Sequence, residues 1–361
     1  MRNSNKDMIS KTPPRRGFFE PAFSQRFAII KPHMLKNVFL FYGENTFGLQ
    51  QEIKRWQEEF EKKYGDLNIE IIENEETAER ITASLESSPF LSEKRLIIVK
   101  NFMENADAKE QEKLGKRLEK IADTTVAVFY EEKGPDKRTS LYRKFKENTQ
   151  LKEFTLPTPL QIDQFLKTQV IKRNLRIQPK EIKFLLDRVG PDLWTLDNEI
   201  QKLSSYCKNR AATEQDIEAL CKENISTSVF KMTDALSEKN AKRAIELLHI
   251  LAENGEETLM IFAMIVRHFR MLLLLSDLKK NATPERDLFN EMKKYDAKMH
   301  PYAVQIATRQ AKNFTHEALK NAYDTLADLD IKFKNGDIQE TEGDRNQSMM
   351  ALERFILNHS R

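Results

Sequence analysis

In the first half of the chain, short apolar runs alternate with segments whose apolar residues recur every three or four positions. The short runs predict five β-strands at Val38–Tyr42, Asn68–Ile72, Arg95–Val99, Val126–Tyr130 and Leu151–Leu156. Several are apolar throughout, which is typical of parallel strands covered on both faces. The segments between them predict helices, marked by Leu49, Ile53, Trp56 and Phe60 and by Leu114, Leu118 and Ile121. The alternation predicts a doubly wound α/β domain with a parallel five-stranded sheet.

Beyond about Thr158 the strand pattern ends and helical patterns continue. Turn or cap signals interrupt them at Gly190, Asn254–Gly255, Pro284 and Asn335–Gly336. We expect two all-α domains, a small bundle over residues 158–226 and a second helical domain over 227–361. Apolar stripes at Leu193, Leu196, Ile200 and Leu203 and at Ala244, Leu247, Leu248 and Leu251 are most simply helix cores. Thr213 and Asp216 predict a cap at one helix start.

The helix after the second strand carries signals at both of its ends. Asn74, followed by two glutamates, predicts its N-cap and an acidic first turn. We expect its buried side to carry Ala78, Ile81 and Leu85. Pro89 stops it and leaves Phe90 and Leu91 between short polar runs. The residues alone favour burial of Phe90 and Leu91 in the domain's own core over an exposed contact surface.

Length and composition indicate a globular protein of two or three domains. The 361 residues include 32% charged and 9% aromatic residues, with a formal net charge of only +3. The net charge is therefore too small to attract the whole chain to nucleic acid. Basic residues exceed acidic ones locally near the N-terminus, and we interpret residues 1–36 as a flexible basic extension without a signal peptide; a weak nucleic-acid anchor is the alternative.

The cysteines and the most hydrophobic segment indicate in which compartment of the cell the protein is expected. Cys207 and Cys221 form neither a metal-spaced pair nor a disulfide framework, so we expect a reducing, cytoplasmic setting. The run Leu259–Leu275 contains Arg267 and Arg270, which are costly in lipid. A buried helix rather than a membrane span is expected there. Motifs for metalloprotease or serine-hydrolase chemistry do not occur in the sequence.

The stretch FLFYGENTFGLQ, residues 39–50, has the spacing of a phosphate-binding loop without its chemistry. Gly43 and Gly48 preserve the turn, but Leu49 stands where a lysine would neutralise phosphate. Lys100 and Asn101 follow the third strand, where acidic residues would hold Mg²⁺. We therefore predict neither a bound nucleotide or metal nor ATP hydrolysis. An ordinary strand-to-helix turn is the simpler interpretation of the two glycines.

Five stretches in the same order carry a family resemblance: FLFYGENTFGLQ, SSPFLSEKRLIIV, YEEKGPDKRTSLYRKFK, VGPDLWTLDNEIQKLSSY and VFKMTDALSEKNAKRAIELL. From about Asn37 to the C-terminus the chain resembles the delta subunits of bacterial DNA polymerase III. The resemblance implies a non-catalytic relative of the AAA+ ATPases without a cofactor. Its domains would be an α/β domain over 37–157, a helical lid over 158–226 and a helical collar over 227–361 that joins a ring of subunits.

The same resemblance implies a role in DNA replication. Delta would bind the sliding clamp (beta) and hold its ring open, while the delta prime and gamma/tau subunits load it onto primed DNA. The clamp-binding tip would be Pro89, Phe90 and Leu91. With the resemblance, we therefore expect Phe90 and Leu91 to be exposed for binding rather than buried in the domain's own core. Two alternatives stay open: an active AAA+ ATPase with unorthodox phosphate ligands, and a stand-alone nucleic-acid-binding scaffold.

Overall fold

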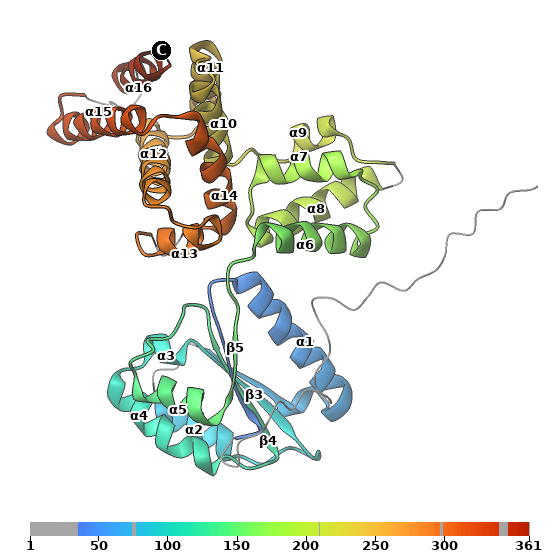
Figure 1. Ribbon diagram of the computed structural model, residues 1–361. Helices are drawn as coiled ribbons and strands as arrows, with labels where there is room; N and C mark the ends of the chain where they lie inside the picture. The colour runs from blue at the N-terminus through green and yellow to red at the C-terminus, as the bar shows by residue number, and fades with distance from the viewer. Residues whose placement is uncertain (1–34, 74–76, 209, 297–298, 339–345, 361) are drawn as a thin grey trace, which may run out of the picture. The chain divides into compact units, whose positions relative to one another are not determined.

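The computed structural model describes residues 35–73, 77–208, 210–296, 299–338 and 346–360. The expected N-terminal extension, residues 1–36, lies outside the described residues except for its last two. The described chain forms two compact units, and Figure 1 shows their helices and strands. The first unit contains residues up to 42 and 53–153, and the second contains 43–52 and 154–361.

The first unit is built on the expected parallel sheet of five strands. Their order across the sheet is β2-β3-β4-β1-β5, and every neighbouring pair is parallel. The strands are β1 (Val38–Tyr42), β2 (Ile69–Glu73), β3 (Arg95–Lys100), β4 (Thr125–Glu131) and β5 (Gln150–Glu153). The predicted strands are confirmed, with ends that differ by up to three residues.

Helices cover both faces of this sheet. They are α1 (Thr46–Tyr64), α2 (Ala78–Glu86), α3 (Phe102–Asn105), α4 (Ala108–Arg117) and α5 (Ser140–Asn148), with short 3-10 helices η1 (Asp66–Asn68) and η2 (Leu118–Lys120). On one face, Phe39 and Phe41 of β1 pack against Trp56 of α1 with ring centroids 4.7 and 5.4 Å apart. On the other, Leu40 shares a core with side chains of α2, α4 and α5. Figure 1 shows these three helices on the face of the sheet opposite α1.

The expected start of α2 is wrong. The helix begins at Ala78 with Thr77 in the N-cap position, whereas Asn74 lies outside the described residues. The strand β2 continues to Glu73, one residue beyond its predicted end, and the helix starts correspondingly later. The predicted buried side is confirmed, since Ala78, Ile81 and Leu85 are all buried.

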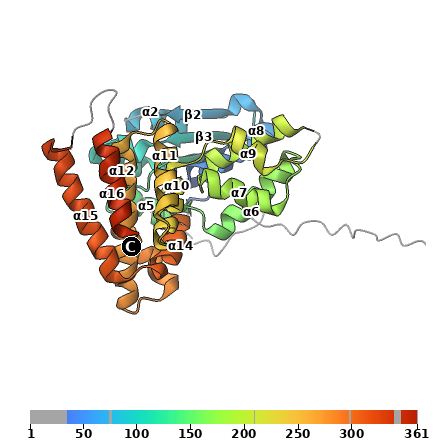
Figure 2. The same cartoon turned by 90° about the horizontal axis from the view of Figure 1, so that it is seen from above.

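The second unit is helical apart from the loop that enters α1. Its helices are α6 (Pro159–Lys172), α7 (Pro179–Val189), α8 (Leu193–Cys207), α9 (Glu214–Leu220), α10 (Ile225–Ser237), α11 (Ala241–Glu253), α12 (Thr258–Lys280), α13 (Leu288–Lys293), α14 (Pro301–Gln310), α15 (His316–Asn335) and α16 (Asn346–His359), with 3-10 helices η3 (Glu285–Asp287) and η4 (Ala311–Asn313). Thr213 and Asp216 form the expected capping box of α9. Figure 2 shows α15 and α16 beside α12.

Two clusters of buried apolar side chains lie in the second unit. One joins α6 to α9 and includes the predicted stripe of α8. The other joins α10 to α16 and includes the predicted stripe of α11. The division into a lid domain over 158–226 and a collar domain over 227–361 stays a prediction, since residues 154–361 belong to one compact unit.

Helix α12 forms the centre of the larger cluster. Among the described residues it is the one helix long and apolar enough to cross a membrane, by length and composition alone. Ile265, Phe269 and Leu272 are buried in the cluster, and Arg267 forms an ion pair with Asp296 at 2.8 Å. The predicted buried helix is confirmed.

Candidate functional site

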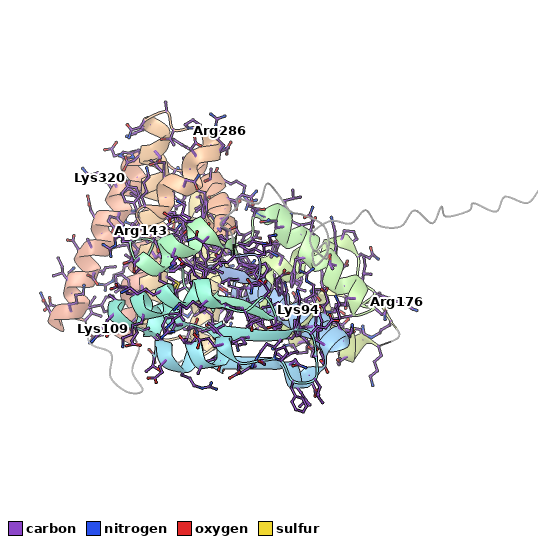
Figure 3. The ribbon with its side chains drawn as sticks, turned by 90° about the horizontal axis from the view of Figure 1, so that it is seen from below. Lys94, Lys109, Arg143, Arg176, Arg286 and Lys320 are labelled. Carbon is purple, nitrogen blue, oxygen red and sulfur yellow. The ribbon has the colours of Figure 1, made fainter. Side chains whose placement is uncertain are left out.

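The loop between α2 and β3 presents an apolar tip. Phe90 is 59% exposed and Leu91 is 92% exposed, while Pro89 is half-buried. The alternative in which Phe90 and Leu91 complete the domain's own core is therefore wrong. Figure 3 shows this end of the domain with Lys94, from the same loop, labelled.

A buried side chain from another loop holds the backbone of the tip. Asn68, only 6% exposed, lies at the end of η1. Its Oδ1 accepts a hydrogen bond from the Phe90 N–H at 2.7 Å, and its Nδ2 donates to the Phe90 carbonyl at 3.1 Å. The same Nδ2 donates to the Tyr64 carbonyl at 2.8 Å. Asn68 thus ties the tip to the end of α1, a role that the sequence analysis missed.

Charged side chains fix the base of the tip. Glu70 of β2 accepts hydrogen bonds from Arg95 of β3 at 2.7 Å and from Arg80 of α2 at 2.8 Å. Arg95 also donates to the Ser87 hydroxyl, at the first residue after α2. Partly exposed ion pairs contribute little free energy each, so this network mainly sets the direction in which the loop leaves the sheet.

Leu91 has a strained backbone. Its φ angle is +49°, in the left-handed region that costs a residue with a Cβ atom about 1–2 kcal/mol. Its side chain is almost fully exposed and gains no compensating burial within the domain. Strain of this kind persists where the surroundings over-determine the backbone, often at binding sites.

In the loop from Gly43 to Gly48, two backbone N–H groups donate hydrogen bonds within the chain. The Asn45 N–H donates to the Phe154 carbonyl at 3.0 Å, and the Gly48 N–H donates to the Asn45 side chain at 2.9 Å. Gly43 has a φ angle of +138°, and a Cβ atom there would lie 2.2 Å from the same Phe154 carbonyl. Glycine at position 43 therefore allows the backbone there to lie close to the backbone at Phe154.

Aromatic side chains of α6 and α8 cover the start of α1. Phe47 packs edge-on against Phe165 and Trp194, with ring centroids 5.1 and 4.8 Å apart. The Trp194 indole N–H donates to the Thr46 hydroxyl at 3.0 Å, and Leu49 is fully buried. Phe47 and Leu49 are thus buried, and Phe47 belongs to the apolar cluster of the second unit.

Lys293 of α13 forms an ion pair with Glu44 of the same loop at 2.6 Å. The carboxylate therefore places negative charge beside the loop and already has a cationic partner. The pairing leaves little net charge at this position, so Lys293 is not a free cation for a polyphosphate.

The polar residues at the ends of β3 and β4 form ion pairs and hydrogen bonds with other residues of the same domain. Lys100 pairs with Glu73, and Asn101 accepts a hydrogen bond from the Glu132 N–H at 3.1 Å. Glu131 is 1% exposed and accepts a hydrogen bond from the Met103 N–H of α3 at 2.8 Å. Burial raises the pKa of Glu131 to about 8. In the described part of the chain, groups of three or more metal-ligating side chains do not occur.

Comparisons with known proteins agree with this geometry. Residues 39–155 match the family model for the DNA polymerase III delta subunit, and residues 226–358 match that for its C-terminal domain. A DNA polymerase III subunit delta from Bacillus subtilis is 24% identical over 333 residues, which cover 89% of this chain and 92% of that protein. A probable subunit delta from Aquifex aeolicus is 23% identical over 310 residues, covering 82% and 85% of the two chains.

A solved structure of the DNA clamp loader delta protein from Bacillus subtilis shares the fold. It superposes with a TM-score of 0.62 at 22% identity and covers 90% of this chain and 95% of its own. The two family models together span the α/β domain and the C-terminal helices, in the order found here. The chain belongs to the family of DNA polymerase III delta subunits.

Proposed function

We propose that this chain is the clamp-opening subunit of the replicative clamp loader. It binds the sliding clamp (beta) and holds the ring open, while the delta prime and gamma/tau subunits use ATP to load it onto primed DNA. The proposal places the protein in the cytoplasm as part of a hetero-oligomer. Family membership supports the assembly, and the tip supports the mode of binding.

The exposed tip is the single observation that carries this proposal. Phe90 and Leu91 leave most of their apolar surface in water, although the loop that holds them is fixed by hydrogen bonds. Burying such a side chain in a partner contributes about 1.5–3 kcal/mol, because apolar surface leaves water. A pre-ordered loop also loses little conformational entropy on binding. Both features are typical of an interface hot spot.

We also propose that the chain itself does not hydrolyse ATP. Two backbone donors of the loop at Gly43 and Gly48 bond within the chain, Leu49 is buried, and Glu131 accepts a hydrogen bond from α3. These contacts argue against an active ATPase with unorthodox ligands. Calorimetry with ATP and Mg²⁺ tests the alternative: failure to bind ATP would exclude an active ATPase.

The substitution Phe90→Ala tests the clamp-binding mode. We expect it to weaken binding to the purified clamp by about 1–3 kcal/mol, because the buried aromatic surface is lost. Leu160→Ala is the matched control, since Leu160 is 67% exposed on α6 of the second unit. Titration of each variant against labelled clamp measures the effect. Unchanged affinity of Phe90→Ala would remove the tip from the interface.

A further inference from the structure

We propose that the clamp-binding surface extends beyond the tip to Leu67, and that Asn68 is the residue that positions Phe90 for binding. This inference rests on the proposed function, because it concerns the same partner. The surface would then consist of two adjoining loops, α1–β2 and α2–β3, with one apolar side chain from the first and two from the second.

Leu67 is an exposed apolar side chain without a role inside the domain. It is 74% exposed in the short helix η1, and its own N–H is held by the Asp66 carboxylate at 2.9 Å. It directly precedes Asn68, whose side chain bonds both backbone groups of Phe90. The hydrogen bonds therefore bring the loop that carries Leu67 against the loop that carries Phe90.

The three side chains share one chemistry. Leu67, Phe90 and Leu91 are among the exposed large apolar residues of the described chain, and they come from two loops that Asn68 joins. A partner that receives Phe90 in an apolar pocket would meet Leu67 at the rim of the same contact. An apolar pocket with an apolar rim on the clamp is therefore the surface that this patch fits.

Asn68 acts through the backbone and does not need to touch the partner. Its carboxamide supplies both an acceptor and a donor to Phe90, which the methyl group of alanine cannot do. Without it, the Phe90 N–H and carbonyl would bond to water and the loop would sample other conformations. Binding would then have to order the loop, which lowers affinity without removing any contact.

Substitution of Leu67 by Ser tests the extended surface. We expect Leu67→Ser to weaken clamp binding about tenfold or more, because the side chain would lose its burial against the partner. Leu160→Ser is the matched control, with similar exposure on α6, and should bind as the wild type does. Thermal unfolding should be unchanged for both variants, since neither side chain is buried in the chain itself.

Asn68 is tested by a double-mutant cycle. We expect Asn68→Ala to weaken binding about tenfold in the wild-type background and to have little further effect in Phe90→Ala, because its role is to position Phe90. An equal loss in both backgrounds would mean that Asn68 only supports the fold, and would overturn its positioning role.

The outcomes separate this inference from the proposed function. Weak binding by Phe90→Ala with normal binding by Leu67→Ser would overturn the extended surface and leave the proposed function intact. Normal binding by both variants would remove the tip from the interface and overturn this inference, whereas failure of the wild-type chain to bind the clamp would contradict the proposed function itself. Weak binding by both, with normal binding by Leu160→Ser, supports both.

Discussion

At the tip of the first unit, the conformation of one residue sets the direction of an exposed side chain. Leu91 occupies the left-handed region although it carries a branched side chain. The neighbouring Phe90 is held through its backbone by Asn68, and not by its ring. The site is therefore specified by backbone geometry, with the apolar side chains left free for a partner.

Replacement of Leu91 by glycine separates stability from binding. Glycine adopts a positive φ angle without the Cβ clash, so we expect the free energy of unfolding to stay equal or rise by up to about 1 kcal/mol. Clamp affinity should fall, because the exposed apolar side chain is lost. Denaturant unfolding and a clamp titration on the same sample measure both. A marked loss of stability would show that Leu91 packs within its own domain.

Among the secondary-structure elements, α3 depends on a carboxyl group at the end of β4. Glu131 is almost fully buried and accepts the Met103 N–H, and burial raises its pKa to about 8. In the unfolded chain the same carboxyl would titrate near its ordinary pKa of about 4.3. The folded state thus binds more protons than the unfolded state between these values. The protonated Glu131 side chain therefore contributes to the stability of the fold at low pH, and this contribution is lost as the pH rises from about 4 to about 8.

The substitution Glu131→Gln should flatten this part of the pH profile. The amide oxygen can still accept the Met103 N–H, but the side chain no longer ionises. Near pH 4 we expect variant and wild type to have similar free energies of unfolding. Near pH 9 we expect the free energy of unfolding of the variant to be higher, on the order of a few kcal/mol. Denaturant unfolding across the pH range measures this difference. A constant difference at all pH values would show that Glu131 does not titrate as described.

Elements with a strong apolar period were predictable from the sequence, whereas contacts between loops were not. The five strands and the stripes of α8 and α11 follow directly from the period of buried positions. The start of α2 was misplaced because Asn74 resembles a cap and nothing local shows that β2 continues. Asn68 and Phe90 are 22 positions apart, and their hydrogen bonds depend on the tertiary fold, so no local pattern could reveal them.

At the scale of the whole molecule, the loop that enters α1 packs with the second unit through Phe47. Residues 43–52 group with the helical unit, and Phe47 packs against Phe165 and Trp194 there. The absence of a phosphate-binding lysine was visible in the sequence at Leu49, but the aromatic packing required the fold. Aromatic side chains therefore join this loop to helices α6 and α8.

The central claim is that this subunit binds the clamp through its apolar tip without using a nucleotide of its own. Titration of the isolated chain against the sliding clamp, with and without ATP and Mg²⁺, tests it most directly. We predict the same dissociation constant under both conditions. The tip is already exposed, and Phe47 and Leu49 of the loop that enters α1 are buried within the chain. Clamp binding that requires ATP, or that changes markedly when ATP is added to the isolated chain, would contradict the claim.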